Sequence, residues 1–491
     1  MFISILQNYY KVNEYFLSTV CCLFLSFLHF FSLLSHIYNS MLDFSLIKNI
    51  HFIGIGGVSL SSLARFFHRK GYCVSGTDST FSPILETLID EGIKIRVGFS
   101  PDAFPRPDLV VYSSAVPETD TELIYMRSIG VPCVERYVLL GYVSSLFPFT
   151  IAISGTHGKT TVSSMCGCVM KTAMLPFYAH IGGESNTLGG CYYSGDTYFL
   201  CEACEYRKSM LALSPFVSVV LNVEFDHPDT YKDKTEVYDT FDTFLQLNPH
   251  GISIINGDCE YYKLRQKHFH LITFGFNIEN DYVMLNIEQH KNGCFGCSIY
   301  HLGVPLVDIL LKVPGKHNLI NACACVAVCN TIGVPTKYIK QGLNEFTGVK
   351  RRFEFCGTFF SSAVYSDYAH HPTEIRETLN TAKLLPHNKL TVVFQPHTFS
   401  RTSSLKAEFI KVLSDCDNLI IVKEYAAREN ADCGCSALSL FNECTVPNKF
   451  YCSNILEVAT VITKQTAPND VILVLGAGDI NNLCKILIST T

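Results

Sequence analysis

An α/β protein of about three domains is predicted by three features of the sequence. The chain has 491 residues, more than one ordinary hydrophobic core accommodates. Two segments, beginning at Asn49 and Phe149, each read as an apolar strand, a glycine-containing turn and a helix. A third group of strands and helices follows Thr347 and ends in an apolar run at 471–475. The expected divisions are an N-terminal extension at 1–45 and domains at 46–145, 146–346 and 347–491.

The composition is that of a globular protein. Hydrophobic residues make up 48% of the chain and charged residues 17%, which supplies sizeable cores and argues against disorder. The net charge is only −6, and acids and bases are scattered along the sequence. No basic face is therefore expected, and we predict no nucleic-acid partner.

An uncharged apolar segment lies near the N-terminus. Residues 16–38 contain no Asp, Glu, Lys or Arg and are long enough to cross a bilayer, which takes about 20 apolar residues. Their flanks carry too little charge to indicate a signal peptide or an orientation. A membrane anchor and a mis-assigned start, with translation beginning at Met41, both stay open. In either case residues 1–40 are expected to contribute nothing to catalysis.

The 22 cysteines allow disulfides, a metal site or buried thiols. There are two CxxC pairs, Cys201 with Cys204 and Cys294 with Cys297. About 90 residues separate the pairs, whereas structural zinc sites have compact spacing. Other cysteines, including Cys325, fall in small-residue helical sequence, where a free thiol packs as a small hydrophobe. We expect reduced thiols.

The first strand–turn–helix unit carries an incomplete dinucleotide fingerprint. Gly54, Gly56 and Gly57 follow the first expected strand, and Ser59 stands where a third glycine is usual. Asp78 ends the second expected strand, 24 residues after Gly54, near the place of a ribose-binding acid. These residues predict a nucleotide-binding turn and leave NAD open.

A glycine loop between the expected strand at 149–154 and a helix is the strongest motif. It consists of Gly155, Thr156, His157, Gly158, Lys159, Thr160 and Thr161. Successive backbone N–H groups at a helix start bind phosphate, and Lys159 adds a positive charge. Thr160 is suitably placed for Mg²⁺. Although only two residues separate its glycines, the loop predicts a nucleoside triphosphate site, and a second nucleotide site disfavours hydride transfer.

Polar residues follow the next apolar runs. They are Glu202 and Glu205, then Asn222, Asp226, His227 and Asp229. Carboxylates and imidazole beside a phosphate loop suit Mg²⁺, although a solvated loop is an equal alternative for Asp229. His317, Asn318 and Asn321 open a later helix, where capping chemistry is the simpler interpretation.

Nine segments, in this order, resemble the Mur ligase family. They are GIGG, GTHGKTT, EACEY, NVEFDHPD, PGKHNLINA, GVKRRFE, DYAHHPTEI, FQPHTFSRT and LGAGDI, between about residues 48 and 482. The resemblance implies a Rossmann-like N-terminal domain holding a UDP-sugar, a central phosphate-loop ATPase domain and a Rossmann-like C-terminal domain that closes over both. It also implies ATP-dependent joining of L-alanine to the carboxylate of UDP-N-acetylmuramate through an acyl phosphate, with Mg²⁺, in cytoplasmic peptidoglycan precursor synthesis.

The same resemblance assigns the site residues. Those expected at the UDP-sugar are Gly54, Gly56, Gly57 and Asp78. Those expected at ATP are Gly155 to Thr161, Asn318, Arg352 and Asp367, with Lys159, His227 and Arg352 as catalytic residues. Those expected at the metal are Thr160, Glu202 and His227. Those expected near the amino acid and the sugar carboxylate are His397 and Arg401.

Four positions depart from the family pattern: Ser59, Ser62, Ser366 and Thr398. They remove no presumed catalytic group, but they leave the geometry of the UDP site and the grip on the amino acid open. The alternatives are a ligase of the same family that recycles a whole peptide onto the same sugar, an NAD-dependent dehydrogenase, and an inactive nucleotide-binding module. The oligomeric state is not predicted.

Overall fold

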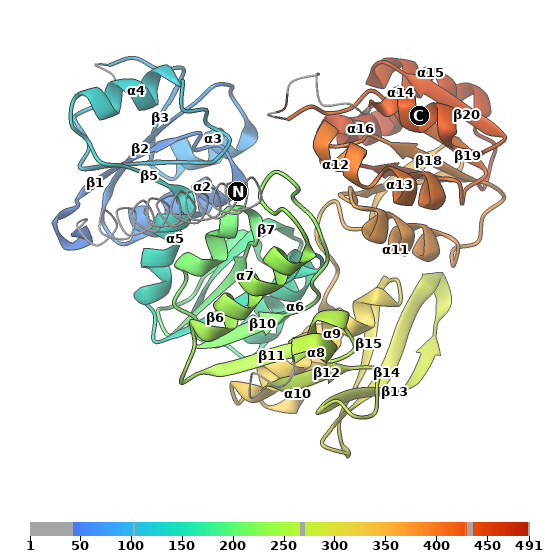
Figure 1. Cartoon of the computed structure of the whole chain (residues 1–491), viewed down its shortest axis with the longest axis horizontal. Coiled ribbons are helices and arrows are strands. Elements are labelled where there is room, and N and C mark those ends of the chain that lie inside the picture. Colours follow the sequence, from blue (N-terminus) through green and yellow to red (C-terminus); the bar gives the residue numbers. More distant parts are fainter. Residues whose placement is uncertain (1–42, 102–103, 266–270, 428, 430–435, 490–491) are drawn as a thin grey trace, which may run out of the picture.

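The computed structural model describes residues 43–101, 104–265, 271–427, 429 and 436–489, which form three α/β lobes (Figure 1). The N-terminal and C-terminal lobes both lie above the central lobe in Figure 1. The apolar segment at 16–38 and Met41 lie outside the described residues. Within the described ranges, no helix has the length and apolar character needed to cross a membrane.

The N-terminal lobe is a five-stranded parallel sheet with the order β3-β2-β1-β4-β5. Its strands are β1 (Asn49–Ile53), β2 (Cys73–Asp78), β3 (Lys94–Val97), β4 (Leu109–Tyr112) and β5 (Cys133–Glu135). Its helices are α2 (Val58–Arg69), α3 (Pro83–Asp90), α4 (Thr121–Ser128) and α5 (Arg136–Ser145). The strand order reverses between β1 and β4, and open parallel sheets bind ligands at such a point. The glycine turn that follows β1 lies there.

The central lobe is a ten-stranded mixed sheet with the order β15-β14-β13-β12-β11-β10-β6-β9-β7-β8. Its strands are β6 (Phe149–Ser154), β7 (Phe177–Ser185), β8 (Gly189–Tyr193), β9 (Tyr198–Ala203), β10 (Val217–Val220), β11 (Ile252–Asn256), β12 (Ile272–Gly275), β13 (Tyr282–Gln289), β14 (Cys294–His301) and β15 (Val304–Pro314). Its helices are α6 (Lys159–Thr172), α7 (Lys234–Gln246), α8 (Glu260–Arg265), α9 (His317–Thr331) and α10 (Thr336–Glu345). Because β6 lies between the parallel strands β9 and β10, the loops after all three strands meet at one edge of the sheet.

The C-terminal lobe is a six-stranded sheet with the order β16-β17-β21-β18-β19-β20, parallel except for β16. Its strands are β16 (Glu354–Phe359), β17 (Ser362–Asp367), β18 (Leu390–Phe394), β19 (Asn418–Val422), β20 (Asn448–Cys452) and β21 (Val471–Leu475). Its helices are α11 (Pro372–Ala382), α12 (Phe399–Ser404), α13 (Lys406–Leu413), α14 (Ala437–Glu443), α15 (Ile455–Gln465) and α16 (Asn482–Ser489).

Two serines that depart from the family pattern lie where the N-terminal lobe meets the central lobe. Ser59 Oγ on α2 lies 2.8 Å from His180 Nε2, and Ser62 Oγ lies 2.9 Å from the Tyr178 hydroxyl, both on β7. Phe66 stacks on the ring of Tyr178, with ring centroids 4.7 Å apart. Burial lowers the pKa of His180 to about 3, which keeps this imidazole neutral. The serines therefore fix α2 against the central sheet.

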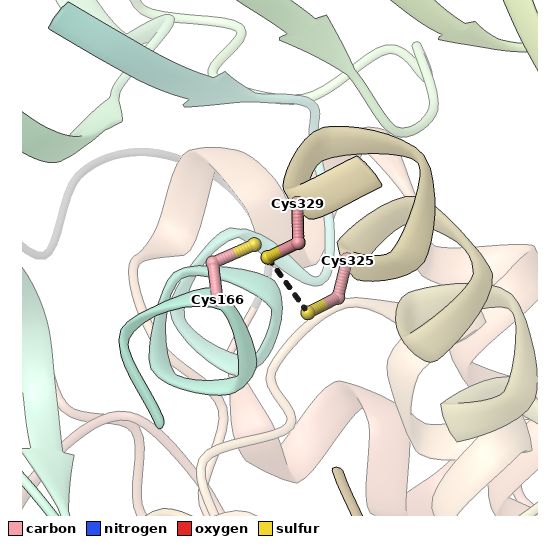
Figure 2. A group of neighbouring side chains, drawn as sticks. All are labelled: Cys166, Cys325 and Cys329. Carbon is pink, nitrogen blue, oxygen red and sulfur yellow. Dashed lines mark hydrogen bonds between the residues drawn. The ribbon is translucent and has the colours of Figure 1, made fainter. Parts of the chain in front are cut away.

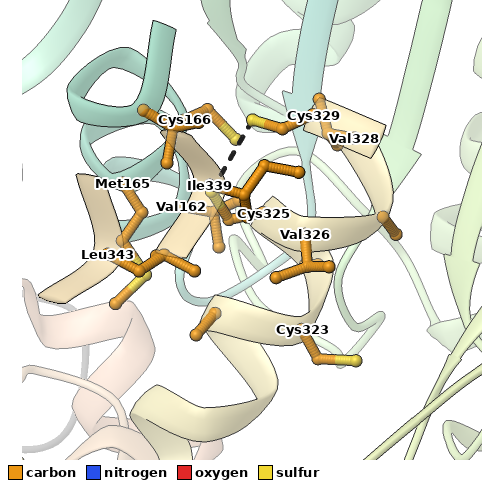
Figure 3. Packing of buried hydrophobic residues seen from close by; sticks show 14 of the residues in the cluster. Val162, Met165, Cys166, Cys323, Cys325, Val326, Val328, Cys329, Ile339 and Leu343 are labelled. Carbon is orange, nitrogen blue, oxygen red and sulfur yellow. Dashed lines mark hydrogen bonds between the residues drawn. The ribbon is translucent and has the colours of Figure 1, made fainter. Parts of the chain in front are cut away.

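Three buried thiols join α6 to α9. Cys166 on α6 points towards Cys325 and Cys329 on α9 (Figure 2), and the last two sulfur atoms are 3.9 Å apart. All three side chains are fully buried, and aliphatic side chains surround them (Figure 3). Burial raises the pKa of Cys325 well above its ordinary value, so this thiol packs as a small neutral hydrophobe. The contact joins two helices whose N-termini carry predicted site residues.

The two CxxC pairs lie in strands of the central sheet or directly after one. Cys201 is buried in β9, and Cys297 is buried in β14. Among the described residues, no group of three neighbouring metal ligands includes a member of either pair. Burial, with the Glu205 carboxylate adding to it, raises the pKa of Cys204 above its ordinary value. This thiol is therefore a poor nucleophile.

Candidate active site

The phosphate loop connects β6 to α6 and encloses a lysine ammonium group. Lys159 opens α6, and its Nζ donates to the carbonyl oxygens of Gly155 at 2.5 Å and Thr156 at 3.1 Å. It also donates to Glu205 Oε2 at 2.8 Å. Burial lowers the pKa of Lys159, but the Glu205 carboxylate more than offsets this, so the pKa lies above its ordinary value. A fixed positive charge therefore lies inside the loop, where a phosphate bound by its N–H groups would meet it.

Asn222, which follows β10, holds the loop in shape. Its Oδ1 accepts from His157 N at 2.8 Å, and its Nδ2 donates to His157 O at 3.0 Å. Its own carbonyl oxygen accepts from Thr156 N at 3.0 Å. Both ends of the side-chain amide are thus engaged with the loop backbone. Asn222 therefore positions the phosphate loop.

The left-handed backbone of Gly158 permits a test of the loop. Gly158 has φ +87°, and a Cβ at this position would lie 2.8 Å from Asn321 Oδ1. Gly158→Ala is expected to cost about 1–2 kcal/mol of stability through its backbone and to weaken ATP binding about tenfold or more. Gly333→Ala is the matched control, because Gly333 has φ +82° with nothing within 4 Å of the added Cβ. Thermal unfolding and calorimetric ATP titration distinguish them: equal ATP affinity in both variants would contradict the loop's role.

The residues predicted to hold a metal lie around the same edge. Thr160 Oγ1 donates to Glu202 Oε2 at 3.1 Å, and Glu202 Oε1 accepts from Gly182 N at 2.6 Å. His227 Nε2 lies 3.6 Å from Glu205 Oε1. A hydroxyl and a half-buried carboxylate are oxygen donors of the kind that Mg²⁺ prefers. Thr160 and Glu202 therefore fit a magnesium ion beside the loop.

His227 has a strained backbone. Its φ is +57°, which is uncommon for a non-glycine residue, and such strain concentrates at functional sites. The conformation is held by Asp226 Oδ1, which accepts from His227 N at 2.7 Å, and by the His227 carbonyl, which accepts from Thr230 N and Tyr231 N. The imidazole is thereby turned towards the junction of the lobes.

A buried ion pair joins the central lobe to the C-terminal lobe. Arg401 on α12 donates from Nε to Asp226 Oδ1 at 2.8 Å and from Nη2 to Asp226 Oδ2 at 3.2 Å. Both side chains are about 6% exposed. Burial would raise the pKa of Asp226, but His227 and Arg401 hold it well below its usual range. Arg401 is predicted to contact substrate. In this structure its Nε and Nη2 instead donate to a carboxylate of the protein.

One cavity gathers most of the residues predicted to bind ATP. Of these, His157, Gly158, Thr161, Asn318, Arg352 and Asp367 line it. Asn318 donates to Pro314 O at 2.7 Å and accepts from Asn321. These are the local contacts at the helix start that the capping interpretation predicts. Asp367 accepts from Phe353 N and Ala369 N, and burial raises its pKa to about 6. The cavity lies between the phosphate loop and the C-terminal lobe.

A second cavity, of about 470 Å³, lies where all three lobes meet. Ala115 contributes from the N-terminal lobe, His227 and Asp229 from the central lobe, and His397 and Arg401 from the C-terminal lobe. Its volume is typical of a small-molecule site, which spans about 300–1,000 Å³. The structure thus brings the predicted substrate residues together with His227.

The residues predicted at the UDP-sugar form a separate turn. Gly54, Gly56, Gly57 and Asp78 line neither cavity. Asp78 Oδ2 accepts from Gly56 N at 2.9 Å, and a Cβ at Gly56 would lie 2.8 Å from the same oxygen. The Asp78 carboxylate therefore stabilises the glycine turn through this backbone hydrogen bond.

Two carboxylates that were not predicted face the phosphate-loop histidine. His157 Nδ1 lies 3.1 Å from Glu374 Oε1 on α11, and His157 Nε2 lies 3.7 Å from Glu224 Oε2. Burial alone would lower the pKa of His157, but the two carboxylates raise it to about 9. Because 217 positions separate Glu374 from His157, no local pattern predicts their contact. The only sequence feature that pointed to Glu374 is its place in the DYAHHPTEI segment.

The chain matches three family models that together cover most of its length. They are "Mur ligase family, catalytic domain" at residues 49–147, "Mur ligase middle domain" at 153–329 and "Mur ligase, glutamate ligase domain" at 351–478. The UDP-N-acetylmuramate–L-alanine ligase of Acetivibrio thermocellus is 39% identical over 449 residues, which are 90% of this chain and 96% of the relative. That of Agathobacter rectalis is 38% identical over 450 residues, 89% of this chain and 97% of the relative.

A solved structure shares the whole fold. The UDP-N-acetylmuramate–alanine ligase of Thermotoga maritima superposes with a TM-score of 0.77 at 26% identity, covering 90% of this chain and 98% of that one. The three family-model matches fall one in each lobe, and the phosphate loop lies within the middle-domain match. The chain belongs to the Mur ligase family.

Proposed function

We propose that this protein is an ATP-dependent ligase that joins L-alanine to the carboxylate of UDP-N-acetylmuramate. The observation that carries the proposal is the cavity of about 470 Å³ lined by side chains from all three lobes. Glu205 links this cavity to the phosphate loop, because it lies 2.8 Å from Lys159 Nζ and 3.6 Å from His227 Nε2. A reaction among a sugar carboxylate, an amine and a nucleotide phosphate needs such a junction. The high similarity to curated alanine ligases supports this substrate pair.

The residues suit chemistry through an acyl phosphate. A carboxylate is a poor electrophile, and transfer of the γ-phosphoryl group of ATP to its oxygen creates a leaving group and releases ADP. Lys159 and Arg352 would spread the charge that develops during this transfer. The alanine amine then attacks the carbonyl carbon, the C–N bond forms, and inorganic phosphate departs. Closure of the lobes would exclude water, which otherwise hydrolyses the intermediate.

Mg²⁺ is part of the proposal. Thr160 and Glu202 would hold one ion, and His227 would serve a second. When bound, the metal would neutralise phosphate charge. We also propose that Gly54, Gly56, Gly57 and Asp78 hold the UDP-sugar and that the domains divide at residues 145/146 and 346/347. Because its substrates are cytosolic metabolites, we place the reaction in the cytoplasm.

Phosphate release tests the function. The full chain is incubated with UDP-N-acetylmuramate, ATP and Mg²⁺ and with each amino acid in turn, and we expect release with L-alanine above all others. Release with a tripeptide and none with alanine would identify a peptide-recycling ligase instead. Absence of release with every acceptor would contradict the proposal. A chain starting at Met41 should turn over at the same rate, because the first strand begins at Asn49.

Isotope transfer tests the intermediate. With ¹⁸O in the carboxylate of UDP-N-acetylmuramate, one labelled oxygen is expected in the released phosphate, since the bond broken in the second step joins that oxygen to carbon. Mass spectrometry of the phosphate measures it. Unlabelled phosphate accompanied by amide product would rule the acyl phosphate out.

A further inference from the structure

A group of potential metal ligands spans the central and C-terminal lobes at the edge of the ATP cavity, which His157 and Glu224 also line. His157 comes from the phosphate loop, Glu224 follows β10, and His371 caps α11 of the C-terminal lobe. Each offers one ligand atom, and the three atoms lie within 4.8 Å of one another. The rings of His157 and His371 have centroids 4.8 Å apart. Two lobes therefore converge on one small space.

Both imidazoles have a buried nitrogen for which the described residues provide no hydrogen bond, and that of His157 lies 3.7 Å from Glu224 Oε2. Among the atoms that the structure describes, Nε2 of His157 and Nε2 of His371 are buried without a hydrogen bond. His371 is only 4% exposed. An unsatisfied buried polar group costs about 1–3 kcal/mol, so such nitrogens call for a ligand.

The surroundings favour a cation at this place. Glu374 lies behind His157 on Nδ1, so Nε2 is left for a metal, which is the carboxylate–histidine arrangement common behind metal ligands. Glu224 Oε2 accepts from Thr373 Oγ1 at 2.7 Å and lies 3.7 Å from His157 Nε2. Arg352 Nη1 lies 3.8 Å from Glu374 Oε1, too far for a hydrogen bond. Two carboxylates thus face two imidazoles.

We propose that His157, Glu224 and His371 form an inter-lobe binding site for a borderline divalent cation such as Zn²⁺. Two imidazole nitrogens with one carboxylate oxygen are a donor set typical of zinc, whereas Mg²⁺ prefers oxygen donors. Tetrahedral zinc with bonds of about 2.0 Å places its ligand atoms about 3.3 Å apart, a little closer than they lie here. Glu224 is half-exposed, so its side chain can move and solvent can deliver the ion.

A cation bound at this site would link the phosphate loop to the start of α11. His371 would give up its long 3.3 Å hydrogen bond from Thr373 N, because a ring that binds a cation through Nε2 carries its proton on Nδ1. Zinc would therefore hold the C-terminal lobe against the central lobe and oppose the opening that admits substrates. This site is separate from Thr160, Glu202 and His227, and its existence does not depend on which substrates the ligase uses.

Equilibrium dialysis of the full chain against Zn²⁺, with excess Mg²⁺ and no nucleotide or sugar, tests the site. We expect one zinc per chain by mass spectrometry and a higher thermal unfolding temperature. His371→Gln and Glu224→Gln should abolish this zinc, and Glu374→Gln should weaken it about 10–100-fold. Circular dichroism checks that each variant is folded, and the two ligand variants act independently.

Two variants serve as controls. His290→Gln removes an exposed histidine of the central lobe, and Cys329→Ala breaks the buried thiol group between α6 and α9, which also could attract zinc. Both should retain the zinc at wild-type affinity. Absence of zinc from the wild-type chain, equal zinc in all variants, or loss only in Cys329→Ala would each overturn the proposal. Ligase activity plays no part in the readout, so failure here leaves the proposed function untouched.

Discussion

Lys159→Ala is expected to reduce ligation by about 10²-fold or more and also to destabilise the protein. The first effect follows because a fixed positive charge at the transferred phosphoryl group is lost. The second follows from the contact with Glu205, which is only 3% exposed and pairs with Lys159 Nζ at 2.8 Å. Removing one partner of a buried pair costs about 3–5 kcal/mol. From the sequence alone, an intact fold would be expected, because only the phosphate contact is foreseen.

A second substitution separates the two effects. Lys159→Ala combined with Glu205→Gln also removes the carboxylate that would be left buried without its partner. The free energy of unfolding, measured with urea, should then return towards the wild-type value, while ligation stays lost. Lys234→Ala is the matched control, because its pair with Glu260 is exposed and contributes at most about 1 kcal/mol. Near-normal turnover in a folded Lys159 variant would remove this residue from the mechanism.

Arg401→Ala is expected to weaken the contact between the central and C-terminal lobes by about 3–5 kcal/mol, because it leaves Asp226 buried without its partner. The lobes should then open more often, which small-angle scattering detects as a larger radius of gyration and steady-state kinetics as a lower kcat/KM. The effect should hold from pH 5 to 8. The depressed pKa of Asp226 keeps the carboxylate ionised there, and its contribution is lost only as the pH falls through that low folded value.

Two further variants are compared with Arg401→Ala. Arg401→Lys keeps the charge but loses the two-pronged contact, so it should recover only part of the loss. Arg65→Ala removes a partly exposed pair in which Arg65 Nε donates to both oxygens of Glu91, and it should change stability by less than about 1 kcal/mol. A radius and a kcat/KM unchanged by Arg401→Ala would show that the pair does not hold the lobes together.

The regular elements near the site could be predicted closely. The strands expected at 149–154 and 471–475 are present as β6 and β21 with the same limits. Parallel strands in the middle of a sheet are buried on both faces, so they need unbroken apolar runs, which are visible in a single sequence. The phosphate loop was equally visible, because a glycine loop between a buried strand and a helix has few structural alternatives.

The roles of the polar residues around the loop were less predictable. The Asp226 carboxylate is of a type that suits Mg²⁺, yet it holds Arg401, and the nearby Asn222 holds the loop backbone. A polar residue after a strand has the same local sequence whether it is solvated, binds a metal or pairs with another lobe. Its partner decides among these, and in the case of Asp226 that partner lies 175 positions away.

By itself, the sequence determined the α/β class, the strands that carry the loops, the phosphate loop and the family resemblance, because each depends on residues that are neighbours in the chain. The tertiary structure alone decided which side chains meet between lobes. His157 contacts Glu374 only because the C-terminal lobe docks on the central lobe. Its contact with Glu224, and that of Lys159 with Glu205, arise where the loops after β6, β9 and β10 meet at one edge of the central sheet. Such contacts depend on the order of strands in a sheet and on the placement of one lobe against another, which no local periodicity records.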